Sequence, residues 1–272
     1  MGVCSDRGAC SRRRAGKNER NEDENHERCS CNVVSQRGET SRALTRDRLP
    51  DLGHGRTVAR TLKRQREGTD RMSAEFILDA PLVRSFVTEV EGAIVGANSP
   101  GEACETIRPR FASLLADPDW LPANFQAPTP ESGMGGGIGQ WLLYRAEGGS
   151  LSLFSLVVPP GSETPIHDHL AWGLVGLYRG TQDEEIYIRG ANGLELVERR
   201  ALRPGDFYVL IPPRDDIHRV RTTSPETSVS IHLLTNDTGC VLRHTYDADS
   251  GTARPFRSGY ANVPCDDRSS GV

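Results

Sequence analysis

Two histidines one residue apart, His167 and His169, follow a Pro-Pro-Gly turn in the stretch TPIHDHLAWGLVGLYRG. Five of the seven histidines of the chain lie between residues 167 and 244. In an extended strand, side chains two residues apart point to the same face, about 7 Å apart, and can converge on one ion, while Asp168 points the other way. The spacing therefore predicts a metal site, and two histidines that only pack at a strand end are the alternative.

A third histidine, His218, follows a Gly-Asp turn, an apolar strand and a Pro-Pro turn in RPGDFYVLIPPRDDIHRV. With it the sequence resembles the cupin superfamily, whose first motif is Gly, five residues, His-x-His, three or four residues, Glu, six residues and Gly. The landmarks of this chain stand at those intervals: Gly161, His167, His169, Gly173 and Gly180. Gly173 occupies the acidic position. The resemblance implies a double-stranded β-helix with His167, His169 and His218 as metal ligands.

The missing glutamate changes the chemistry of such a site. Three neutral imidazoles leave a divalent ion with its full charge and with open coordination positions, so the ion can take an anionic, chelating ligand and still bind dioxygen. A thiolate is a soft ligand suited to this role. Imidazole alone does not select the metal, because copper, nickel and zinc also bind it. We therefore infer Fe(2+), one ion per chain, from the chemistry and not from the spacing.

The narrower resemblance is to the bacterial thiol dioxygenases, the cysteine and 3-mercaptopropionate dioxygenases, and it covers about residues 76–265. These cupins hold iron(II) on three histidines and convert a thiol to a sulfinate with both atoms of O₂. After the third ligand they carry Ser-x-His-x-Tyr, where this chain has Ser230, His232 and Leu234. The resemblance implies catalytic roles for His232 and Ser230, hydrogen-bonded to each other. Leu234 replaces the family tyrosine and leaves the substrate open; the candidate substitutes are Tyr178, Tyr187 and Tyr208.

An arginine is expected to hold the carboxylate of the substrate. Arg243 lies eleven residues after His232, which is the offset that the 3-mercaptopropionate enzymes use. Cysteine dioxygenase takes its anchor from a strand before the metal pair, and Arg145 is the candidate there. A plain ion pair with an acidic side chain is the alternative for Arg243. Trp172 is predicted to form a wall of the pocket.

The elements that must position these residues follow from the hydrophobic pattern. Apolar residues recur at intervals of three and four over 80–95 and again over 99–117, which predicts two helices. From Trp141 the period changes to two, in short β-branched and aromatic runs separated by turns. The fold class predicted is mainly β: a cupin double-stranded β-helix, or jelly-roll barrel, over 140–250, after a helical lead-in over 76–125 with two or three α-helices. Together they make one domain, 73–265.

Residues 1–72 contain no Phe, Trp or Tyr and carry 17 Lys and Arg against 11 Asp and Glu. Such a segment cannot bury enough surface to offset its ordering entropy, so it is predicted to be a disordered basic arm, or a gene-model extension before Met72. Its mixed charges make nucleic acid an unlikely partner. Residues 266–272 are predicted to be a disordered tail.

Four of the seven cysteines lie in the arm at spacings that fit no zinc motif. The other three, Cys104, Cys240 and Cys265, show no spacing pattern, which favours a reduced, cytoplasmic protein. No run of 18 apolar residues exists, so no membrane partner is expected. The oligomeric state is not predicted.

The sequence as a whole predicts a non-haem iron(II) dioxygenase that oxidises a small thiol, of the cysteine or 3-mercaptopropionate type, to its sulfinate with O₂. One alternative is a cupin metalloenzyme that acts on a non-thiol substrate. Another is a ligand-sensing cupin whose basic arm binds nucleic acid.

Overall fold

The computed structural model describes residues 73–130, 133–191 and 193–265. The predicted arm 1–72 and tail 266–272 lie outside the described residues. The helices are α1 (Pro81–Gly96) and α2 (Pro100–Ala116), and the 3-10 turns are η1 (Ala123–Gln126) and η2 (Glu147–Gly149). The strands are β1 (Glu75–Phe76), β2 (Gly139–Arg145), β3 (Ser152–Val158), β4 (Ile166–His167), β5 (Gly173–Arg179), β6 (Gln182–Gly190), β7 (Gly193–Leu202), β8 (Phe207–Leu210), β9 (Ile217–Thr222), β10 (Ser228–Leu234), β11 (Arg243–Tyr246) and β12 (Ala253–Phe256).

Two antiparallel six-stranded sheets form the barrel, in the orders β1-β2-β3-β10-β5-β8 and β12-β11-β4-β9-β6-β7. The chain moves between the sheets, so that β3-β10-β5-β8 faces β4-β9-β6-β7. This is the strand order of a jelly roll, whose long-range pairings bring distant segments together. The mainly β class and the two antiparallel sheets after two helices are as predicted.

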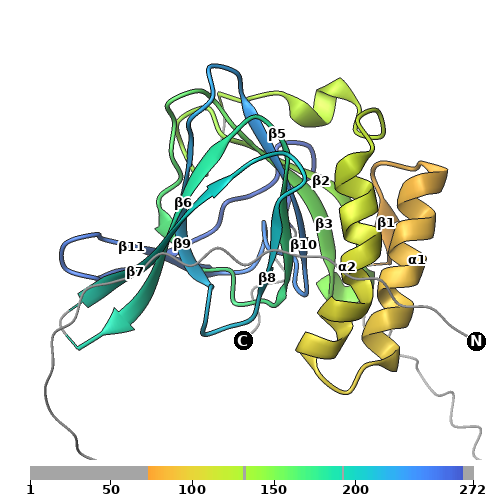
Figure 1. Ribbon diagram of the computed structural model, residues 1–272, viewed down its shortest axis with the longest axis horizontal. Helices are drawn as coiled ribbons and strands as arrows, with labels where there is room; N and C mark the ends of the chain where they lie inside the picture. Colours follow the sequence, from red (N-terminus) through yellow and green to blue (C-terminus); the bar gives the residue numbers. More distant parts are fainter. Residues whose placement is uncertain (1–72, 131–132, 192, 266–272) are drawn as a thin grey trace, which may run out of the picture. The chain divides into compact units, whose positions relative to one another are not determined.

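The two helices lie side by side against the sheet that contains β2 and β3 (Figure 1). Ser99 caps α2, and its hydroxyl accepts a hydrogen bond from the backbone N–H of Glu102 at 3.2 Å. Each helix buries one apolar face, with Phe86 of α1 and Phe111 of α2 at most 1% exposed. This packing excludes water from the outer face of the first sheet and leaves its inner face to the barrel.

The register of three strand pairs fixes where the chemistry-bearing residues meet. His167 in β4 lies directly opposite His218 in β9. His232 in β10 lies between Phe154 of β3 and Val175 of β5. His167 and His218 lie in one sheet and His232 lies in the other, so the inner faces of both sheets contribute to one site.

Two expectations from the sequence need correction. The strand that carries the first histidine ends at His167, and His169 lies just beyond it. Cys240 and Cys265 form a disulfide, while Cys104 is free and buried. The prediction of reduced cysteines is therefore wrong for this pair, and the cysteines no longer argue for a cytoplasmic location. Within the described ranges, the helices are too short or too polar to cross a membrane.

Candidate metal centre

His167, His169 and His218 converge inside the barrel, with one ring nitrogen of each within 4.8 Å of the others. Their ring centroids are 4.7 to 5.0 Å apart, and none of the three side chains is more than 1% exposed. Nε2 of His218 is buried and has no hydrogen-bond partner. Buried polar atoms rarely stay unpaired, so this arrangement fits a metal ion better than a packed apolar core.

Two aspartates hold the loop that carries the histidine pair. The Asp168 carboxylate points away from the ring cluster and accepts three hydrogen bonds at 2.8 Å, from the backbone N–H and Nδ1 of His244 and from the Tyr246 hydroxyl. Asp216 accepts from the backbone N–H of His169 at 2.8 Å. Because both contacts join segments far apart in the sequence, they fix His169 although it lies outside the strand.

The outer ring nitrogens of two histidines are also anchored. Nδ1 of His167 donates to the Pro165 carbonyl at 2.8 Å. Nδ1 of His218 donates to the carboxylate of Glu184, which also accepts a hydrogen bond from the Tyr208 hydroxyl. Such partners fix the tautomer and leave Nε2 for a metal, and a carboxylate raises the basicity of the ligand.

Glu184 is a site residue that the sequence interpretation missed. It lies two residues before Ile186, which is the register partner of His218, so both share the inner face of β6. Only 1% of Glu184 is exposed. In the sequence Glu184 is the middle one of three consecutive acidic residues, so nothing local shows that this one faces inward.

Burial favours the neutral form of His167 and His169. It lowers the pKa of His167 and of His169 well below its usual value, and the neighbouring His218 and Arg243 lower it further. Burial raises the pKa of Tyr208 well above its usual value, and Glu184 raises it further, so the phenol stays protonated and donates. Neutral imidazole is the form that binds a metal, so these two histidines would not have to lose a proton to bind one at neutral pH.

A narrow cavity adjoins the histidines. Its walls come from both sheets and from the loop before β2, and the lining residues are Met134, Gln140, Phe154, Leu156, His167, His169, His232, Thr238 and Arg243. In this conformation the side chains leave no room for a water-sized molecule, so a ligand could enter only if one of them moved. The single full charge in this lining is that of Arg243.

Arg243 is 1% exposed, yet its guanidinium hydrogen bonds only to uncharged acceptors. Nη1 donates to the Asp168 carbonyl at 2.7 Å, Nη2 to the Ser258 hydroxyl at 2.8 Å and Nε to the Thr238 carbonyl at 3.2 Å. Burial lowers the pKa of Arg243 to about 10, so it remains charged at neutral pH. A buried cation without a paired carboxylate among the described residues is costly, and an anionic ligand in the cavity would offset that cost.

Two further polar side chains face the cavity with unused hydrogen-bonding capacity. Gln140 is 4% exposed, and neither its amide nitrogen nor its amide oxygen has a partner. His232 forms the hydrogen bond to Ser230 that the family resemblance implies, from Nε2 at 3.0 Å, while its Nδ1 is buried without a partner. The ring of His232 stacks on Phe154 at 4.7 Å. Gln140 was not identified from the sequence, because nothing local distinguishes it from an ordinary strand residue.

Two predicted substrate-binding residues lie elsewhere. Arg145 pairs with Asp237 at 3.0 Å and with Glu75 at 2.7 Å, and it does not line the cavity. Trp172 packs with the core beneath the helices and is likewise absent from the cavity lining. Both side chains therefore support the barrel wall in this structure, and Arg243 is the arginine that the fold brings to the histidines.

Gly173 and Leu234 face each other across β5 and β10. A Cβ at position 173 would lie 1.9 Å from the Leu233 carbonyl oxygen, so the backbone leaves no room for a glutamate or a cysteine there. Of the three candidate replacement tyrosines, Tyr178 bonds to the Pro118 carbonyl and Tyr187 to Glu185, and only Tyr208 reaches the surroundings of a ligand. Its hydroxyl donates to Glu184, the carboxylate that also accepts from Nδ1 of His218.

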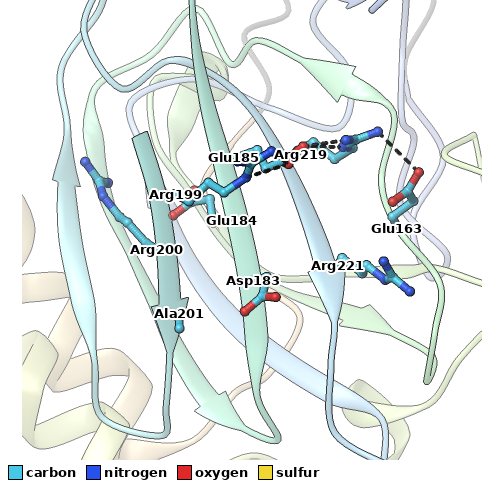
Figure 2. A pocket seen from close by; sticks show the side chains of 9 residues that line it. All are labelled: Glu163, Asp183, Glu184, Glu185, Arg199, Arg200, Ala201, Arg219 and Arg221. Carbon is cyan, nitrogen blue, oxygen red and sulfur yellow. Dashed lines mark hydrogen bonds and ion pairs between the residues drawn. The ribbon is translucent and has the colours of Figure 1, made fainter. Parts of the chain in front are cut away.

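A separate pocket of about 290 Å³ lies over β6, β7 and β9 and is lined mostly by charged side chains (Figure 2). Glu185 binds both Arg199 and Arg219, and Arg219 also reaches Glu163 at 3.3 Å. Acidic and basic groups alternate across the strands and largely neutralise one another. This surface has the character of an exposed cross-strand ion-pair network.

No protein-family model matches the chain. Among solved structures, it is similar to peruvianin-I, a cysteine peptidase from Thevetia peruviana latex, at 20% identity and a TM-score of 0.34 over 43% of this chain and 71% of that one. It is similar to the oxalate decarboxylase of Lactobacillus farciminis at 15% identity and a TM-score of 0.28, over 33% of this chain and only 25% of that one. A cupin 2 domain-containing protein from Halorhodospira halophila is 15% identical, with a TM-score of 0.29 over 48% of this chain and 72% of that one.

Proposed function

We propose that the protein is a cupin metalloenzyme that oxidises a small thiol acid to its sulfinate with O₂, using one Fe(2+) per chain held by His167, His169 and His218. The observation that carries the proposal is the buried Arg243, charged and without a carboxylate partner among the described residues, in the lining of the narrow cavity beside three convergent histidines. The ion and the arginine together offer two fixed points, one for sulfur and one for a carboxylate.

The reaction balances without a further reductant. A thiolate and one O₂ give one sulfinate, so both oxygen atoms end on sulfur, and the four electrons that reduce O₂ come from the sulfur. Iron(II) on three neutral imidazoles would supply open positions for the thiolate and for O₂.

The protein side chains contribute binding, orientation and exclusion of water. Arg243 offers a fixed guanidinium fork to the substrate carboxylate, which Lys could not match. The free amide of Gln140 can donate to or accept from a second polar group of the substrate. His232, held by Ser230, presents Nδ1 as a hydrogen-bonding group on the sulfur side, and Phe154 keeps its ring in place. The orientation by two attachment points is the main source of rate that this geometry can provide.

The test is O₂ consumption by the iron-loaded protein with a panel of thiols that differ in one group at a time. 3-Mercaptopropionate and cysteine carry a carboxylate, whereas cysteamine does not. We expect stoichiometric O₂ uptake and sulfinate formation with a thiol acid and far slower uptake with cysteamine. No uptake with any thiol would refute the proposed reaction.

A paired substitution tests the ligand set. His218→Ala is expected to abolish iron binding, whereas His232→Ala is expected to retain about one iron per chain, because His232 already bonds to Ser230. Iron content after gel filtration is the measurement. Equal loss of iron in both variants would show that His232 is a ligand.

A cupin metalloenzyme for a non-thiol substrate is the second candidate, and Leu234 is the observation that favours it. Leu234 is fully buried at the position of the family tyrosine, and no other tyrosine places a free hydroxyl in the cavity lining. The site would suit a substrate whose reaction needs no hydrogen bond from a tyrosine hydroxyl equally well. O₂ uptake or turnover with small carboxylic acids that lack sulfur, in the absence of turnover with thiols, would decide for this candidate.

A further inference from the structure

The last described segment, residues 256–265, starts at the end of β12, which pairs with β11 in the same sheet as His167 and His218, and then bonds to the backbone of two other segments. The Gly259 N–H donates to the Gly239 carbonyl at 2.8 Å, and the Ala261 N–H donates to the Gln140 carbonyl at 2.7 Å. Asn262 exchanges two hydrogen bonds with the backbone of Leu142, at 3.0 and 2.9 Å. We call residues 256–265 the C-terminal clamp.

The clamp contacts two of the polar residues that line the cavity, Arg243 and Gln140. The Ser258 hydroxyl accepts from Nη2 of Arg243 at 2.8 Å, and the Arg243 guanidinium lies over the Phe256 ring, 4.7 Å from its centroid. The Ala261 contact is to the backbone of Gln140. Ser258 is 6% exposed, so its hydrogen bond to the arginine is shielded from water.

A pocket of about 370 Å³ lies between the clamp and the loop before β2. Its lining residues are all uncharged: Thr129, Gly133, Ile138, Gln140, Ser258, Gly259, Tyr260 and Ala261. Gln140 lines this pocket and the inner cavity alike. The clamp therefore forms a wall of the outer pocket and a support of the inner cavity at once.

The Cys240–Cys265 disulfide joins the end of the clamp to the turn that carries Thr238. Cys240 is 1% exposed, whereas Cys265 is half-buried and is the more accessible sulfur. Gly239, next to Cys240, receives the Tyr260 ring so closely that a Cβ there would lie 2.5 Å from it. The turn and the clamp are thus fastened by one covalent bond and by close packing.

We propose that Ser258 is a positioning residue for Arg243, and that the Cys240–Cys265 disulfide fastens the clamp so that its reduction loosens Arg243 and weakens the binding of anionic substrates. The inference rests on the proposed function, in which Arg243 holds a carboxylate. The disulfide thereby couples the thiol redox state of the surroundings to the affinity of the site.

The redox step is ordinary thiol–disulfide exchange. A thiolate of a dithiol donor attacks Sγ of Cys265, the S–S bond breaks, and Cys240 leaves as the thiolate and takes a proton. The second thiol of the donor then displaces Cys265 from the mixed disulfide. Two electrons pass to the protein, and the donor is oxidised to its own disulfide.

The experiment measures binding without turnover. The dissociation constants of 3-mercaptopropionate and cysteamine are determined by calorimetry on iron(II)-loaded protein under nitrogen. The samples are the wild type, Cys265→Ser, Ser258→Ala and wild type reduced by a phosphine that is removed before titration. We expect about tenfold weaker binding of the acid in the three altered samples and less than a twofold change for the amine. Ser250→Ala, which removes another hydrogen-bonded hydroxyl in the turn after β11, is the matched control and should bind both thiols as the wild type does.

Amide hydrogen exchange provides a second readout that does not depend on the proposed reaction. The amides of Gly259 and Ala261 should exchange faster in Cys265→Ser and in the reduced protein, while the amides of β10 stay protected. Unchanged exchange would overturn the fastening role of the disulfide, and equal weakening of acid and amine would overturn the positioning role of Ser258. If the wild type binds no thiol, the proposed function fails, while the exchange rates still decide whether the disulfide fastens the clamp.

Discussion

Glu184→Gln is the substitution that most directly distinguishes an effect on metal affinity from an effect on the stability of the fold. The side chain keeps its shape and its acceptor oxygen toward Nδ1 of His218, but it loses the negative charge. A hydrogen bond to a charged group contributes about 1.5–3 kcal/mol and one between neutral groups about 0.5–1.5 kcal/mol. The difference of about 1–1.5 kcal/mol predicts roughly a tenfold weaker metal affinity, at the lower edge of the 10- to 100-fold range for such partners.

Stability should change in the opposite sense or not at all. The second carboxylate oxygen of Glu184 is buried without a hydrogen-bond partner, so the charge is incompletely compensated in the metal-free protein. Removing that charge relieves a desolvation cost. The unfolding free energy of metal-free Glu184→Gln is therefore expected to equal or exceed that of the wild type.

The assay is competition for iron(II) with a chromogenic chelator under nitrogen, paired with urea unfolding of the metal-free protein. Glu185→Gln is the matched control, because the next residue faces the other side of β6 and pairs with Arg219. Tyr208→Phe removes the other donor to Glu184 and should weaken the metal by less than Glu184→Gln does. An unchanged affinity in Glu184→Gln, or an equal loss in the Glu185 control, would refute the role assigned to Glu184.

Three further outcomes are expected. Arg243→Ala should lower kcat/KM for 3-mercaptopropionate by about 30- to 1000-fold and for cysteamine far less, with Arg243→Lys between wild type and Ala; equal losses on both thiols would make the arginine structural. Burial lowers the pKa of His167, His169 and His232 in the folded protein. As the pH falls below about 6.5, these histidines therefore bind protons in the unfolded chain while they are still neutral in the folded one. As the pH falls, each of these histidines should lower the unfolding free energy of the metal-free protein by up to about 1.4 kcal/mol per pH unit. The measurement is urea unfolding at pH values from 7.5 to 5.5, and an unfolding free energy that does not change over this range would contradict the prediction. A chain that starts at Met72 should melt within a few degrees of the full chain and turn over normally; a larger fall in Tm would show that the preceding residues pack on the domain.

The local hydrophobic patterns of the sequence were sufficient to predict the two helices and most of the strands. The apolar spacing of three and four in α1 and α2, and the alternation from Trp141 onward, reflect how each segment must bury one face. The predicted barrel, 140–250, corresponds to the stretch from β2 to β11. The two-residue β1 and the short β12 were missed, because strands at a sheet edge need little hydrophobic patterning of their own.

The motif spacing also identified the three histidines, since His-x-His and a later histidine are a local signature. The resemblance favoured Arg243 as the anchor, because of its offset from His232, and kept Arg145 as a second candidate. The fold separates them: Arg145 is neutralised by Asp237 and Glu75, whereas Arg243 reaches the cavity and finds only uncharged acceptors.

The remaining contacts of the site are set by the tertiary structure and could not be predicted from the sequence. Glu184 behind His218, Gln140 beside His232 and the disulfide from Cys240 to Cys265 are each contacts between segments that the jelly roll brings together from separate strands or loops. Residue types and spacing report what a segment can do by itself, which fixed the helices, the alternating strands and the histidine motif. The partner that shields, neutralises or restrains a side chain is set by strand register and by chain crossings between sheets, and these depend on the packing of the whole barrel.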